Sequence, residues 1–106
     1  MDIQEYQQQS SATAIYPNDA ALPYLALGLS NEAGEAAGKV KKFLRGDFPP
    51  DELRDVLEAE LGDVLWYMAQ LAELMGLTLD DIAAYNLDKL QGRLRAGTLQ
   101  GDGDDR

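Results

Sequence analysis

The feature that most constrains the fold is a regular series of apolar side chains in the second half of the chain. Its members follow one another at intervals of three and four residues, the period of an α-helix: Leu53, Leu57, Leu61, Val64, Met68, Leu71 and Met75. Asp47-Phe48-Pro49-Pro50 interrupts any earlier helix and Gly76 follows the series, which predicts a helix over about residues 51–75. Trp66 falls on roughly the opposite side of this helix. Two of its surfaces should therefore be buried, and we expect self-association.

Helical signals dominate the rest of the chain, and β-branched residues are sparse. We predict a short helix over about residues 2–14 capped by Asp2, a long helix over about 20–44, and a last helix that begins after the capping box at Thr78 and runs to about Ala96. The sequence thus predicts an all-α fold, a helical bundle of three main helices plus a short N-terminal helix. A core this small gives a single chain only marginal stability, and we therefore expect oligomerisation to complete it. Residues 1–98 should form one domain and residues 99–106 a disordered acidic tail.

The composition removes many kinds of chemistry. Of 106 residues, 19 are Asp or Glu and 9 are Lys or Arg, so the formal net charge is −10, and the chain has neither His nor Cys. Ser-His-Asp and Cys-His catalysis, zinc fingers and His-containing di-iron sites are therefore excluded. The acidity argues against nucleic acid or an anionic membrane as a partner. With no signal peptide and no apolar run of bilayer length, we expect a cytoplasmic protein.

Two pairs of acids occur where the apolar faces of the predicted helices end. Glu32 and Glu35 lie three residues apart on one helix, and Glu60 and Asp63 have the same spacing on the next. If the helices pack side by side, four carboxylates converge, and a divalent cation such as Mg²⁺ is the simplest compensation for their charge. The alternative is an ordinary solvated face, or a Glu60 that pairs with a lysine.

A third polar group lies on the last helix. Asn86 falls inside its apolar arc, and Lys89 and Arg93 follow three and seven residues later on the edge of that arc. An amide, an ammonium and a guanidinium on one stripe are suited to binding phosphate oxygens. The alternative is a hydrogen-bonded Asn beside basic residues that favour a helix C-terminus.

These residues resemble the signature of the MazG-like nucleotide pyrophosphohydrolases. Glu32-Ala33-Gly34-Glu35 is separated by 24 residues from Glu60-Leu61-Gly62-Asp63, and this fits the Glu-x-x-Glu and Glu-x-x-Asp motifs of that family. The flanking segments, residues 27–31 and 64–67, are similar as well. Residues 86–93 resemble the phosphate-contacting segment. The resemblance extends over about residues 22–94.

The resemblance implies a helical enzyme that hydrolyses a nucleoside triphosphate, often a deoxy or non-standard one, to the monophosphate and pyrophosphate. It implies Mg²⁺, with Mn²⁺ as a substitute, and a homodimer or a dimer of dimers. Its metal ligands would be Glu32, Glu35, Glu60 and Asp63, and Glu35 would also deprotonate the attacking water.

On the substrate side, the resemblance implies Asn86, Lys89 and Arg93 as phosphate contacts, with Lys39 as a further candidate. Tyr67 is one of six aromatic residues that are able to stack on a base, although packing is the usual role of such side chains. The alternative function is a non-catalytic acidic helical adaptor that has kept the family fold.

Overall fold

The computed structural model describes residues 1–106, and its regular elements are all helical. Helix α1 (Ile3–Ser10) is followed by two short 3₁₀ turns, η1 (Ser11–Thr13) and η2 (Asn18–Ala20), and by three long helices: α2 (Ala21–Leu44), α3 (Pro50–Leu74) and α4 (Leu79–Ala96). The all-α prediction is confirmed, and the predicted bounds of the long helices agree closely with the observed ones. None of the helices combines the length and the apolar composition that crossing a bilayer requires.

The helix ends follow from local chemistry. The Asp2 carboxylate accepts a hydrogen bond from the Glu5 amide at 2.8 Å, and the Thr78 hydroxyl accepts one from the Asp81 amide at 3.0 Å, so both predicted N-caps are present. Pro50 occupies the first turn of α3, where its missing N–H costs nothing. Gly97 ends α4 in the left-handed conformation, with a φ of 74°.

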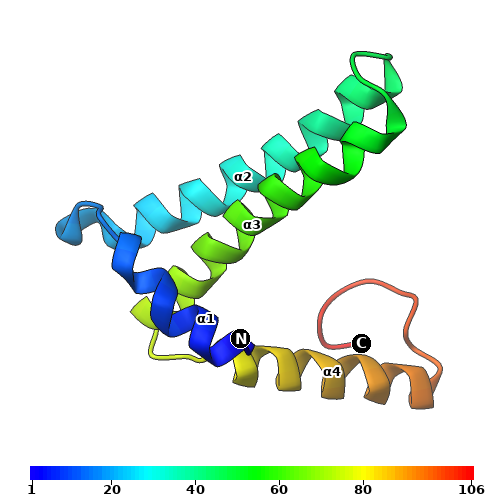
Figure 1. The fold of residues 1–106 in the computed structure, drawn as a ribbon. Helices are drawn as coiled ribbons and strands as arrows, with labels where there is room; N and C mark the ends of the chain where they lie inside the picture. The colour runs from blue at the N-terminus through cyan, green and yellow to red at the C-terminus, as the bar shows by residue number, and fades with distance from the viewer.

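The three long helices are not arranged as three parallel rods. Helices α2 and α3 run side by side as an antiparallel pair, whereas α4 leaves the end of this pair and projects away from it (Figure 1). Helix α1 packs where α3 and α4 meet. Residues 99–106 have no regular secondary structure and turn back along α4 (Figure 1). The disorder expected for them stays a prediction.

The buried core is small and lies at the junction of α1, α3 and α4. Ala69, Ala72 and Leu79 form its centre. Only 9 of the 106 residues are buried, and members of the apolar series on α3 remain open, with Leu61 57% and Met75 55% exposed. A single chain therefore leaves part of the predicted core face uncovered.

A polar network attaches α1 to the α3–α4 turn. The Gln7 side-chain amide donates to the Glu73 carboxylate at 2.9 Å and to the Leu77 carbonyl at 3.0 Å, and its oxygen accepts from the Leu79 amide at 2.7 Å. The buried Gln70 amide donates to the Ser10 hydroxyl at 2.8 Å. Because each of these buried polar groups has a hydrogen-bond partner, the structure avoids the free-energy cost of burying an unpaired donor or acceptor.

The side of α3 that carries Trp66 is covered by the N-terminal segment of the same chain. Its indole N–H donates to the Ser10 carbonyl at 3.1 Å and to the Thr13 hydroxyl at 2.9 Å. The expectation that α3 packs on two sides is met here by the N-terminal segment rather than by a second copy. Burial of this side of α3 therefore does not require self-association.

Candidate active site

The pairing of α2 with α3 brings together three of the four predicted acids. One carboxylate oxygen from each of Glu32, Glu60 and Asp63 lies within 4.8 Å of the others. Glu32 and Glu60 are partly buried, whereas Asp63 is exposed. We refer to these three residues as the acid cluster.

Glu35 lies outside the acid cluster, on the solvent side of α2. It lines a polar groove whose other walls come from the same helix: Ser30, Asn31, Gly34, Gly38, Lys41 and Lys42. Its charge nevertheless helps to raise the pKa of Glu32. Glu35 is thus adjacent to the acid cluster without being packed into it.

The acid cluster carries unbalanced negative charge. Burial raises the pKa of Glu32, and the charges of Asp63, Glu60 and Glu35 and a hydrogen bond with Glu60 raise it further. One cation is close, since the Lys39 ammonium lies 4.0 Å from a Glu60 carboxylate oxygen. A lysine partner for Glu60, one of the alternatives considered from the sequence, is therefore present. A single lysine leaves this group of acids net negative, and an all-oxygen donor set of this kind suits Mg²⁺.

Tyr67 stands beside the acid cluster in a position that depends on a glycine. A Cβ atom at position 28 would lie 2.1 Å from Cε1 of Tyr67, so only glycine allows the ring to pack here against α2. Burial raises the pKa of Tyr67, with further contributions from Tyr24 and the acids Glu32 and Asp63. Trp66 packs edge-on against the Tyr67 ring, with a centroid distance of 5.0 Å. The observed role of Tyr67 is thus packing, close enough to the acid cluster for the charges of Glu32 and Asp63 to raise the pKa of its phenol.

The basic stripe of Asn86, Lys89 and Arg93 lies on α4, apart from the acid cluster. No hydrogen bond or ion pair joins the two groups, and α4 diverges from the α2–α3 pair (Figure 1). Asn86 lines an apolar hollow between α4 and the side chains of Ile3 and Leu65. The two halves of the predicted site therefore do not meet within one chain.

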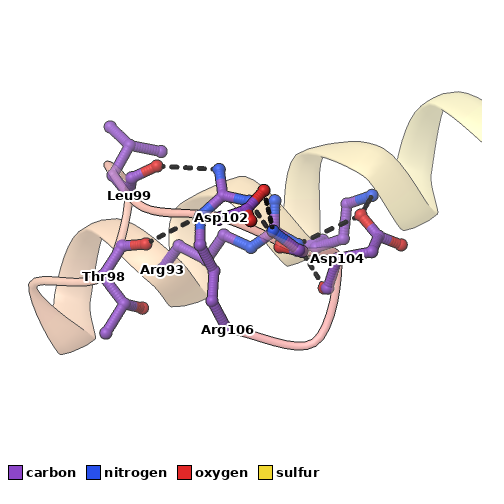
Figure 2. A network of polar contacts seen from close by, with 8 residues as sticks. Arg93, Thr98, Leu99, Asp102, Asp104 and Arg106 are labelled. Atoms are coloured by element: carbon purple, nitrogen blue, oxygen red, sulfur yellow. Dashed lines mark hydrogen bonds and ion pairs between the residues drawn. The ribbon is translucent and has the colours of Figure 1, made fainter.

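The partner of the two cations lies in the acidic tail, to which the sequence analysis assigned no contact with them. Asp104, in the C-terminal tail, pairs with Lys89 at 2.8 Å and with Arg93 at 3.1 Å (Figure 2). The available signal was the charge pattern, because an acidic segment follows a helix whose last turns are basic.

Together, fold and site define an all-helical protein whose central helix pair carries clustered carboxylates. Residues 22–97, well over half of the chain, match the model of the MazG nucleotide pyrophosphohydrolase domain. The chain belongs to the MazG family. The matched segment contains α3, α4 and all of α2 except its first residue, and therefore both the acid cluster and the basic stripe.

Two relatives have similar sequences. The Gene 37 protein of Mycobacterium phage L5 is 46% identical over an alignment of 114 residues that covers all of both chains. The Uncharacterized protein YvdC of Bacillus subtilis (strain 168) is 34% identical over 79 residues, which covers 67% of this chain and 74% of the relative. No solved structure matches the chain significantly.

Proposed function

We propose that this protein is a Mg²⁺-dependent nucleoside triphosphate pyrophosphohydrolase. It would convert an NTP or dNTP, including non-canonical ones, to the monophosphate and pyrophosphate. The observation that carries the proposal is the acid cluster. Three residues of the family motif form it, in a chain that belongs to this family. Because nucleoside triphosphates are made and used in the cytoplasm, the substrate implies a cytoplasmic location.

The acid cluster is the proposed metal site. Glu32, Glu60 and Asp63 would hold Mg²⁺, or Mn²⁺ in its place, with Glu35 as a fourth carboxylate at the edge. A divalent cation supplies charge neutralisation for the phosphates and lowers the pKa of bound water. Glu35 is exposed and outside the cluster, so its carboxylate is available to accept the proton of the attacking water.

The remaining predicted residues would position the substrate. Lys89 and Arg93, with Asn86 on the same stripe, would bind phosphate oxygens. Because the stripe does not meet the acid cluster within one chain, they would act on a substrate held at the acid cluster of a second copy. Lys39 lies at the rim of the acid cluster, where its ammonium would face a phosphate bound to the same metal. The Tyr67 phenol lies within the electrostatic influence of the acids, and its ring is the aromatic surface we propose for the base.

We further propose that the active form is a homodimer or a dimer of dimers. Helix α4 exposes Leu87 and Leu94, with the partly covered Leu90 between them, and the three lie at helical spacing on one face. A second copy would bury this stripe and the open part of the α3 series. Sedimentation equilibrium should show a dimer or tetramer that Leu94→Glu converts to a folded monomer, since Leu94 is 67% exposed in the single chain. A wild-type monomer at high concentration would contradict this.

The function is tested by separating pyrophosphate release from phosphate release. Purified protein with Mg²⁺ is incubated with canonical, deoxy and modified triphosphates, and we expect pyrophosphate. Asp63→Asn and Glu35→Gln should abolish it while circular dichroism remains unchanged. Glu58→Gln is the matched control, because Glu58 is an exposed acid of α3 outside the cluster and should keep full activity.

Three outcomes would overturn the proposal. Full activity in both Asp63→Asn and Glu35→Gln would remove the acids from the chemistry. Release of phosphate without pyrophosphate would change the reaction class. Hydrolysis of no nucleotide, together with no thermal stabilisation by Mg²⁺ and a non-hydrolysable triphosphate, would favour the adaptor.

A further inference from the structure

The C-terminal tail places one acidic residue between the two cations of the basic stripe. Oδ1 of Asp104 accepts from the Lys89 ammonium at 2.8 Å and from Nη2 of Arg93 at 3.1 Å (Figure 2). The backbone carbonyl of Asp104 accepts a second hydrogen bond from the same nitrogen of Arg93. One residue therefore presents two oxygens to this pair of cations, as a phosphate group would.

The cations form a built site rather than two solvated side chains. The Arg93 side chain is only 7% exposed, and every hydrogen bond that its guanidinium makes goes to Asp104. The side chain of Asp104 remains 74% exposed. Lys89 and Arg93 lower the pKa of Asp104, so it is charged at neutral pH. A buried guanidinium is thus matched by an anion that is open to solvent and able to leave.

Arg106 fastens the tail in the loop that presents Asp104. Its guanidinium donates to the carbonyls of Thr98 at 3.2 Å, Leu99 at 2.9 Å and Gly103 at 2.5 Å (Figure 2). These bonds join the end of the chain to the end of α4. The loop is therefore closed on itself and holds Asp104 against the helix.

The tail and the apolar stripe of α4 use different faces of the helix. At 100° per residue, Lys89 lies roughly 100° or more around the axis from all three leucines, whereas Arg93 lies about 60° from Leu90 and at least about 100° from Leu87 and Leu94. A second copy centred on Leu87 and Leu94 would consequently leave the contact between Asp104 and Lys89 in place.

We propose that the C-terminal tail is an intramolecular competitor for the Lys89–Arg93 anion site, with Asp104 occupying the place of a substrate phosphate. The proposal rests on the proposed function, in which these two side chains bind a triphosphate. The ligand must displace the tail before its phosphates reach the cations. An exposed carboxylate is held weakly, but the tether gives it an effective concentration of roughly millimolar. We expect the tail to weaken binding by about threefold to tenfold.

A metal-free binding experiment tests the competition directly. Inorganic tripolyphosphate is titrated in EDTA into ¹⁵N-labelled full-length protein, and the amide signals of residues 99–106 and of α4 are followed. The tail signals should move to random-coil positions as the α4 signals shift. Asp104→Asn should bind about threefold to tenfold more tightly, whereas Asp105→Asn, which removes the same charge one residue away from the contact, should behave as the wild type.

Kinetics of the Mg²⁺-loaded protein provide the second readout. Asp104→Asn should lower the KM for the triphosphate by the same factor with kcat unchanged, and Asp105→Asn should change neither. If nothing is hydrolysed but tripolyphosphate still displaces the tail, the enzyme proposal fails and the competition stands. If pyrophosphate is released but Asp104→Asn matches Asp105→Asn in both assays, the competition is overturned and the enzyme remains.

Discussion

Replacing Glu32 by Gln removes one negative charge from the acid cluster while nearly preserving the size and shape of the side chain. Glu32 has the charges of both Glu60 and Asp63 close to it, and a hydrogen bond with Glu60 favours its protonated form. Glutamine has nearly the same size and keeps an N–H donor for that hydrogen bond. We therefore expect Glu32→Gln to make the metal-free protein more stable and, at the same time, to weaken metal binding.

The size of the effect follows from the distance between the carboxylates. Two unit charges 4.8 Å apart repel by about 1 kcal/mol in bulk water and about 3.5 kcal/mol at an effective dielectric constant of 20. Asp63 is exposed and Lys39 offsets part of the charge on Glu60, so the lower value applies to each of the two pairs. We expect a gain of roughly 1–2 kcal/mol, or roughly 5–15 °C in Tm for a chain of this size.

The assay is thermal and urea unfolding at pH 7.5 in EDTA and again in Mg²⁺. Wild type should gain stability from Mg²⁺, because a ligand that binds only the folded state stabilises it. Glu32→Gln should begin higher in EDTA and lose most of the Mg²⁺ response, whereas Glu58→Gln should show the wild-type response. A Glu32→Gln protein that is no more stable than wild type in EDTA, or that keeps the full Mg²⁺ shift, refutes the reasoning.

The same cluster predicts a pH dependence of the metal-free protein. Burial and the neighbouring acids raise the pKa of Glu32 above its ordinary value of 4.5, so the folded chain binds this proton more tightly than the unfolded chain does. The resulting stabilisation is complete below pH 4.5 and is lost as the pH rises through the raised pKa. We measure the free energy of unfolding from below pH 4.5 to above the raised pKa of Glu32. It should fall more steeply with pH for wild type than for Glu32→Gln, and equal slopes would contradict a raised pKa of Glu32.

Two further predictions concern the packing of the helices. Gln7→Ala should cost roughly 2–3 kcal/mol in urea unfolding, because it removes three hydrogen bonds and leaves the buried Leu79 amide without its partner; a cost below about 0.5 kcal/mol would show that the network contributes little. Gly28→Ala should cost about 1–3 kcal/mol by displacing the Tyr67 ring, whereas Gly38→Ala, whose added Cβ meets nothing within 4 Å, should gain about 0.5–1 kcal/mol. The opposite sign for either glycine in the same assay would contradict the packing described.

The sequence predicted the helices well because their ends depend on local chemistry. Asp2, Thr78 and the Pro49-Pro50 pair act within one turn of their own positions, and each is found where its type indicates. The direction of α4 was not predictable in this way. It depends on the few side chains that meet at the α1–α3–α4 junction, and no periodicity in one helix specifies the angle of the next.

In the candidate site, too, the features set by local spacing were predictable from the sequence and those set by tertiary packing were not. The i, i+3 spacing and the pairing of neighbouring helices were enough to predict that Glu32, Glu60 and Asp63 converge. Glu35 shares the spacing, yet its side chain lies on the solvent side of α2 and outside the cluster; the spacing alone does not specify which carboxylate of a pair faces the neighbouring helix. The Gln7 network was not predicted. A buried glutamine in a short polar helix has the same sequence context as a glutamine on a solvent-exposed face.

In the free chain, each half of the site has a counter-charge supplied by the protein itself. Lys39 lies 4.0 Å from Glu60 in the acid cluster, and Asp104 lies between Lys89 and Arg93 in the basic stripe. A complex of Mg²⁺ with a triphosphate carries both complementary charges, because the metal suits the acids and the phosphates suit the bases. On the proposed function, binding therefore exchanges two weak internal pairs for two stronger external ones. Since Asp104 is the more exposed of the internal partners, the basic half should exchange first, and Asp104→Asn should alter substrate affinity without altering the affinity for the metal alone.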